Sequence, residues 1–206
     1  MANRSYVEHL AFTASEGFLA DKSLFDQLKV WLDNNITGFL KVFWGFEVQE
    51  PTHAHIFVLW KSPELHKQAS QHPEFHSGFM PLFSKLFTAP GPSVHLIDYD
   101  NDPTNAFSAA VTEFAIVKPK EGHTQAEIDE VAELIKAGVA GQDGIHLPLV
   151  RGPVVNSDQS DYAQAAGWDS IEAHLKVIQT PSVAALGGKI FGIAHMDFKH
   201  IVLKEA

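Results

Sequence analysis

The chain has 206 residues, of which 45% are hydrophobic and 19% are charged, so it can bury the core of one large globular domain or two small ones. Its formal net charge of −10 argues against nucleic acid and against an anionic membrane as partners. Cysteine is absent, which excludes disulfides, zinc–thiolate sites and thiol nucleophiles. The sequence shows neither a signal peptide nor a transmembrane segment, and we expect a soluble, cytoplasmic protein.

The first half of the sequence has the pattern of a ferredoxin-like unit. A helix is predicted over 23–33, where Ser23 and Asp26 resemble a capping box ahead of one apolar face. A second helical region is interrupted at Pro73, because a helix rarely continues through proline. Strands are predicted at 6–12, 39–48, 54–60 and 94–99. The resulting order is β-α-β-β-α-β.

The second half repeats this order after a linker at 100–111 that is rich in Asp, Asn, Pro and Ser. Thr124 and Glu127 predict a capping box at the start of its first helix, and Ser170 begins its second helical region. Strands are predicted at 112–118, 145–155, 162–168 and 193–203.

Short segments of the two halves also align in sequence. EHLAFTASEG at 8–17 matches EFAIVKPKEG at 113–122, and WKSPELH at 60–66 matches WDSIEAH at 168–174. HLIDY at 95–99 likewise parallels HMDF at 195–198. We interpret these matches as a duplicated unit.

Some of the recurring residues have a plain structural interpretation. The pairs Glu64–His66 and Glu172–His174 occur in both halves, which favours a hydrogen bond on a helix surface or at an interface. Trp60 and Trp168 are interpreted as core anchors.

A four-stranded antiparallel sheet with helices on one face leaves its other face to be covered. Two such sheets in one chain can cover each other. We therefore predict an α+β fold in which two tandem ferredoxin-like β-α-β-β-α-β units form an intrachain dimeric α+β barrel, with its halves at 1–103 and 104–206. The pseudo-dimeric chain could associate further as a homodimer.

Histidines gather beside apolar sequence in the first half. HPEFHSGF at 72–79 leads into an apolar helical stripe at Phe79, Leu82, Phe83, Leu86 and Phe87. A histidine in an apolar pocket stays neutral near pH 7 and can remove a proton from carbon flanked by carbonyls without a metal. The alternative is that a few histidines, satisfied by their neighbours, cap a hydrophobic core.

Residues 8–100 resemble the stress-responsive A/B barrel family of the dimeric α+β barrel superfamily, which includes a plant polyketide cyclase. The resemblance rests on His9-Leu10, VFWGFEV at 42–48, His55-Ile56, the His-Pro-x-x-His-x-Gly-Phe segment at 72–79, and Ile97-Asp98-Tyr99. In the cyclase the second histidine of the corresponding segment is a general base. The resemblance thus implies that His76 is the base here, while Ala69 replaces the tyrosine that partners it.

The resemblance also implies which half carries the site. His9 and His55 match pocket-lining histidines of the family, whereas the second half has Phe114 and Ala163 at the aligned positions. Thr180-Pro181 likewise stands in place of His72-Pro73. We therefore expect the functional pocket in the first half alone.

The sequence-based hypothesis is a cofactor-independent cyclase, lyase or isomerase that acts on a small hydrophobic carbonyl or phenolic compound. His76 would be the general base, with His55 and His9 orienting the substrate oxygen. The residues expected to bind the substrate are His72, Phe79, Phe83, Trp31 and Trp44. No metal and no cofactor are expected.

Two other functions stay open at this point. Relatives of this fold oxidise polyphenols or degrade haem, so the resemblance also allows a monooxygenase. The third possibility is a non-catalytic stress protein that binds a hydrophobic ligand. His53 and His55 share a strand face and could bind a metal, although no nearby carboxylate has ligand spacing.

Overall fold

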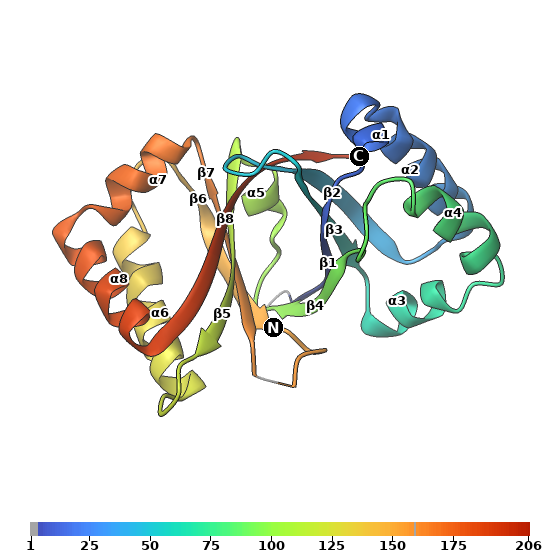
Figure 1. The fold of residues 1–206 in the computed structure, drawn as a ribbon. Helices are drawn as coiled ribbons and strands as arrows, with labels where there is room; N and C mark the ends of the chain where they lie inside the picture. The colour runs from blue at the N-terminus through green and yellow to red at the C-terminus, as the bar shows by residue number, and fades with distance from the viewer. Residues whose placement is uncertain (1–3, 159) are drawn as a thin grey trace.

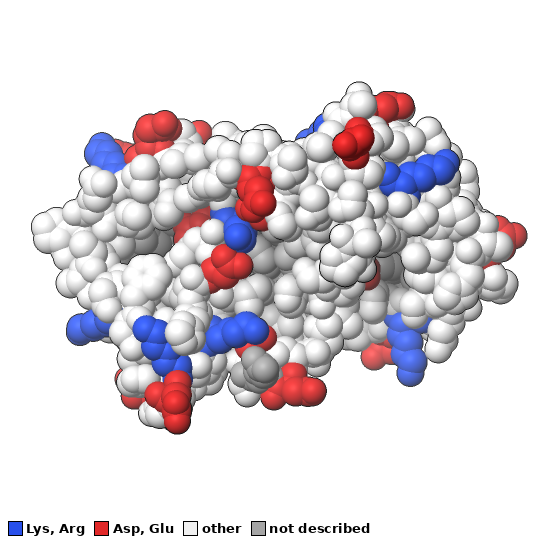
Figure 2. Space-filling view, in the orientation of Figure 1, with Lys and Arg blue, Asp and Glu red and all other residues white. Residues whose placement is uncertain are grey.

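The computed structural model describes residues 4–158 and 160–206, and the two four-stranded halves of its sheet face each other in the middle of the molecule (Figure 1). The main helices cover the two outer sides, with α1 to α4 over one sheet and α6 to α8 over the other (Figure 1). None of the helices in the described part of the chain is long and apolar enough to cross a membrane. On the face in view, Lys and Arg side chains are interspersed with Asp and Glu (Figure 2).

The first half follows the predicted order and adds short helices. Its helical region does break at Pro73, and a π-helical turn, η1, follows the break. The elements are β1 (Ser5–Thr13), α1 (Glu16–Ala20), α2 (Ser23–Asn35), β2 (Phe39–Glu47), β3 (His53–Trp60), α3 (Pro63–Ser70), η1 (Phe75–Phe79), α4 (Met80–Phe83) and β4 (Ser93–Tyr99).

The second half repeats the order with longer helices. Its elements are α5 (Thr104–Phe107), β5 (Val111–Pro119), α6 (Gln125–Val139), β6 (Ile145–Pro153), β7 (Tyr162–Trp168), α7 (Ile171–Ile178), α8 (Pro181–Ile193) and β8 (Ala194–Glu205).

One of the two predicted helix caps is confirmed. The Thr124 side chain accepts from the Glu127 backbone N–H and Glu127 reaches back to the Thr124 backbone, which completes the capping box of α6. The predicted cap at Ser23 and Asp26 is wrong, because the N-cap position of α2 is Lys22. Asp21, just before this position, instead accepts from the Ser23 backbone N–H at 2.9 Å.

All eight strands form one antiparallel sheet that curls into a nearly closed barrel, as predicted. The strand order is β4-β1-β3-β2-β8-β5-β7-β6, so each half has the same internal arrangement. β2 pairs with β8 from Phe43↔Glu205 to Glu47↔Ile201, which joins the two halves. The free edges, β4 and β6, meet at an isolated bridge between Ile97 and Val154.

The inner faces of the two halves of the sheet share one hydrophobic core. It contains Phe43 and Phe57 from the first half together with Phe114 and Ile201 from the second. Phe107, on α5, is fully buried in this core. The segment predicted as a linker at 100–111 therefore contributes a helix and a core side chain. Because side chains alternate along a strand, the outer faces form separate cores beneath the helices.

Glycines lie at both contacts between the halves, at matching register. Gly45 on β2 is opposite His55, and Gly152 on β6 is opposite Ala163, the residue aligned with His55. A Cβ at Gly45 would collide with the backbone carbonyl of Val202, and one at Gly152 would collide with the carbonyl of Asp98. The barrel can close only where no side chain separates these strands.

We therefore predict that Gly45→Ala and Gly152→Ala each lower the free energy of unfolding by about 1–3 kcal/mol or more, because backbone must move to admit the methyl group. The matched control is Gly187→Ala on α8, where an added Cβ meets nothing within 4 Å. It should raise stability by about 0.5–1 kcal/mol through helix propensity. Urea denaturation measures all three, and equal midpoints for wild type and the two strand variants would contradict this view of the barrel contacts.

Candidate active site

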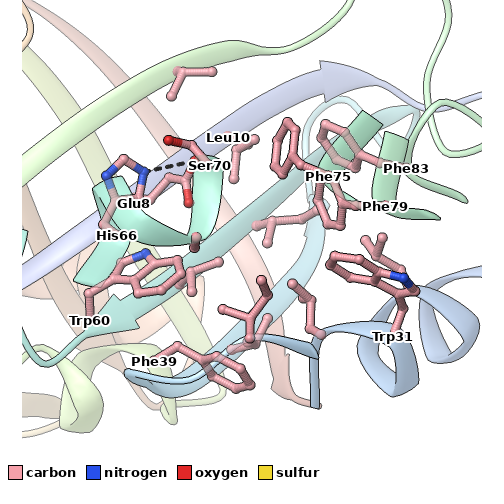
Figure 3. A pocket seen from close by; sticks show the side chains of 18 of the residues that line it. Glu8, Leu10, Trp31, Phe39, Trp60, His66, Ser70, Phe75, Phe79 and Phe83 are labelled. Atoms are coloured by element: carbon pink, nitrogen blue, oxygen red, sulfur yellow. Dashed lines mark ion pairs between the residues drawn. The ribbon is translucent and has the colours of Figure 1, made fainter. Parts of the chain in front are cut away.

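A pocket of about 210 Å³ lies between the outer face of the first-half sheet and the helices that cover it (Figure 3). Leu10 on β1 and Ile56 and Val58 on β3 form its floor, because these positions point away from the barrel interior. The helices α2, η1 and α4 supply its aromatic walls. The aromatic lining residues are Phe25, Trp31, Phe39, Trp60, Phe75, Phe79 and Phe83.

One end of this otherwise apolar pocket carries polar groups. His66 Nε2 lies 3.5 Å from Glu8 Oε1, and the two side chains are only 17% and 20% exposed. Trp60 packs edge-on to His66, with ring centroids 5.3 Å apart. Its indole Nε1 is buried without a hydrogen-bond partner among the described residues. Ser70, at the last position of α3, also lines the pocket.

The position of His66 is set by where α3 begins. Ser62 is the N-cap residue, accepting from the Leu65 backbone N–H, and Pro63 occupies the first helical turn. His66 therefore follows one turn after the cap and faces β1, where Glu8 points outward beside the inward His9. An imidazole and a carboxylate from two different elements thus lie side by side at this end of the pocket.

The second half has the same three residue types at the aligned positions, Glu113, Trp168 and His174. There the three side chains contact one another directly. Trp168 Nε1 donates to Glu113 Oε2 at 3.0 Å, and His174 Nε2 lies 3.3 Å from the same oxygen. Burial raises the pKa of Glu113, and burial lowers the pKa of His174 to about 4. The partners of His66 and His174 are thus the strand carboxylates Glu8 and Glu113.

Three of the five residues predicted to bind substrate line the pocket, namely Trp31, Phe79 and Phe83. Trp44 does not, because it stacks on Phe25 at 4.6 Å beneath the helices. His72 lies beside Trp31, edge-on at 5.7 Å, and is not among the lining residues.

The three predicted catalytic histidines are not brought together. His76 lies exposed on η1, where its ring meets the edge of Phe75. His9 and His55 are buried on the opposite face of the sheet, inside the barrel. The catalytic roles assigned to these histidines remain predictions, but a common cavity for all three is not what the structure has.

Inside the barrel, His9 and His55 belong to a row of hydrogen-bonded side chains. Glu47 Oε1 lies 2.9 Å from His55 Nε2, His55 Nδ1 lies 2.9 Å from His9 Nε2, and His9 Nδ1 lies 3.3 Å from His95 Nδ1. An ionised Glu47 can only accept, so each neutral imidazole must donate toward Glu47 and accept from the next. The ring nitrogens of His9 thus face different partners, and no group of three or more His, Asp or Glu within the described ranges is placed to hold one metal ion.

Burial sets the protonation states of this row. It lowers the pKa of His9, and the neighbouring His55 and His95 lower it further. Burial also lowers the pKa of His55 and of His95, although Glu47 and Asp161 respectively act in the opposite direction. Burial raises the pKa of Glu47, but the His55 hydrogen bond, together with nearby positive charge, outweighs it and the net pKa is lowered. The row is therefore a neutral set of imidazoles ending on a carboxylate.

Acid should destabilise the protein through these imidazoles. Below about pH 6.5 the unfolded chain binds protons that the folded chain excludes, so the free energy of unfolding falls by up to about 1.4 kcal/mol per pH unit for each such histidine. His95→Asn keeps a hydrogen-bonding group beside His9, but asparagine does not titrate. The variant should therefore lower this slope by up to about 1.4 kcal/mol per pH unit. Urea titrations between pH 7 and 5 measure it. The exposed His76→Asn is the control, and an unchanged slope in His95→Asn would contradict the assignment.

Comparisons with known proteins define the fold. The sequence matches no protein-family model and no curated protein. Among solved structures, the chain is similar to a candidate monooxygenase from Fusobacterium nucleatum, with 11% identity, a TM-score of 0.73, and 100% of this chain and 95% of that chain covered.

Two further structures are similar over almost the whole chain. An anthrone oxidase-like protein is 16% identical with a TM-score of 0.66, covering 99% of this chain and 94% of that one. Chlorite dismutase from Candidatus Nitrospira defluvii is 8% identical with a TM-score of 0.60, covering 96% and 90%. At these identities the likeness extends to the fold alone, which is that of the dimeric α+β barrel within one chain.

Proposed function

We propose that this protein is a cofactor-independent enzyme that removes a proton from a small, flat, hydrophobic carbonyl or phenolic compound bound in the first-half pocket. The observation that carries the proposal is the Glu8–His66 pair at the polar end of a pocket whose other walls are apolar. This places the base on His66 and not on His76, which lies outside the pocket.

The shape of the pocket favours a planar ligand. Phe75, Phe79 and Phe83 stack in a row with centroids 5.1 and 5.3 Å apart and interplanar angles of 23° and 25°. Trp31 lies 5.5 Å from Phe79 across the same wall. Such walls bind a ring system by contact and burial without charge. Affinity would therefore come from apolar surface, and orientation from the polar end.

The proton step follows from the pair itself. A C–H bond acidified by a carbonyl, directly or through a conjugated ring, or the O–H bond of a phenol, is broken; its proton is taken up at His66, and Glu8 stabilises the imidazolium. The low-dielectric walls strengthen this attraction. The substrate keeps the electron pair as an enolate or phenolate, which can close onto a second carbonyl, as in a cyclase.

The same enolate can instead react with O₂, and this second candidate function has support from the structural neighbours. A monooxygenase assignment and an anthrone oxidase-like description occur among proteins that share this fold over its full length. For a CH₂ group flanked by two rings, one O₂ converts CH₂ to C=O and releases one water, so atoms and electrons balance without a cofactor. Both candidates depend on the same first proton transfer.

Anthrone is a suitable probe because its CH₂ is acidic and flanked by two rings. Under anaerobic conditions in D₂O the protein should catalyse deuterium exchange at this carbon, which reports the base alone. Under air, O₂ consumption and anthraquinone formation report the oxygenase outcome. Exchange without O₂ consumption would favour the cyclase, lyase or isomerase class.

His66→Gln should reduce the anaerobic exchange rate by about 10²–10⁴-fold, the usual cost of losing a general base, with little change in the thermal midpoint. Glu8→Gln should reduce it less, because the imidazole remains. His76→Ala tests the sequence-based assignment in the same assay, and His123→Ala is a half-buried control in the second half. Loss of exchange in His76→Ala with a normal rate in His66→Gln would reverse our assignment, and no exchange in wild type would leave a passive binding protein.

A further inference from the structure

We infer that the indole N–H of Trp60 is the group that selects the substrate, by donating a hydrogen bond to a hydroxyl, keto or enolate oxygen on the bound ring system. This deepens the proposed function and rests on it, since it assigns the chemical class of the ligand in the same pocket. Trp60 would be a positioning and specificity residue, with the proton transfer left to His66 and Glu8.

The first observation is an unsatisfied donor at the polar end of the cavity. Trp60 is 5% exposed, lines the pocket, and its Nε1 has no hydrogen-bond partner in the described part of the chain. The nitrogen-bearing edge of its ring lies toward His66 and Glu8 (Figure 3). Buried N–H groups are nearly always paired in folded proteins. A buried donor without a partner, on a side chain that lines a cavity, therefore points to a partner from outside the chain.

The second observation is the matched tryptophan in the other half. Trp168 donates to Glu113 Oε2 at 3.0 Å, and this closes the second-half set without an external partner. In the first half, Glu8 lies 3.5 Å from His66 Nε2 and accepts nothing from Trp60. The two halves thus hold the same residue types, but in the first half the indole donor has no partner among the described residues and belongs to a side chain that lines a cavity.

An indole N–H determines what kind of atom it can hold. It only donates, so it selects an acceptor oxygen and not an ammonium or an amide N–H. An oxygen seated there would lie next to the Glu8–His66 pair, so the carbon that it activates is the one from which His66 takes the proton. As that proton leaves, negative charge grows on the oxygen and the hydrogen bond strengthens. The substrate is accordingly a phenol, enol or ketone and not a bare hydrocarbon.

The test compares two ligands of nearly equal shape, 2-naphthol and 2-methylnaphthalene, by equilibrium binding. Trp60→Phe keeps an aromatic ring but removes the donor, and should weaken 2-naphthol about tenfold, or about 1.4 kcal/mol. Its effect on 2-methylnaphthalene should be less than about twofold. Trp168→Phe is the matched control: it should lower the thermal midpoint, because it removes a bond to Glu113, but change neither dissociation constant.

A second measurement on the wild-type protein covers the case in which Trp60→Phe does not fold. The Trp60 indole N–H resonance, in ¹⁵N-labelled protein, should move downfield with 2-naphthol and much less with 2-methylnaphthalene. Equal effects of the two ligands, in either experiment, would overturn the role of Trp60 while pocket binding stands. If neither ligand binds the wild-type protein, the pocket itself and both proposals fail.

Discussion

The pairing of β2 with β8 is the interaction on which the rest of the molecule depends. It joins the two sheets into one barrel, and so it decides which face of every strand is inside. Because side chains alternate along a strand, His9 turns into the barrel while its neighbours Glu8 and Leu10 turn toward the helices. Gly45 and Gly152 make this closure possible at the two equivalent contacts between the halves. A single backbone constraint thus separates two sets of histidines and carboxylates.

These two sets have different physical characters. The row from Glu47 through His55 and His9 is buried among packed aromatic side chains, and its polar atoms satisfy one another. Such a network favours a unique packed arrangement of the barrel interior. The Glu8–His66 pair instead lies at a cavity and next to an indole donor with no partner in the described chain. A bound ligand can use hydrogen-bonding groups that lie at a cavity without a full set of partners. For this reason we place the chemistry on the outer face of the sheet.

Much of the fold could be predicted from the sequence, whereas the polar end of the site could not. The strand patterns and the aligned segments of the two halves predict the barrel. Helical spacing predicts that Phe79 and Phe83 share an apolar face. The carboxylate that meets His66 on α3 comes from the strand β1, which is distant in sequence, so the pairing could not be read from sequence spacing. The recurrence of Glu8, Trp60 and His66 as Glu113, Trp168 and His174 was the available signal. His76 came from a motif resemblance, and that motif does not encode that His76 is exposed on η1 while Phe75 and Phe79 of the same turn line the pocket.

The most direct test of the account is a crystal structure of the protein with 2-naphthol bound. We predict electron density for the ring between the first-half sheet and the helices α2 and α4, against Phe79 and Phe83. Its oxygen should lie within hydrogen-bond distance of Trp60 Nε1 and close to the Glu8–His66 pair. Density inside the barrel beside His9 and His55, or beneath α6 and α8 in the second half, would contradict the central claim.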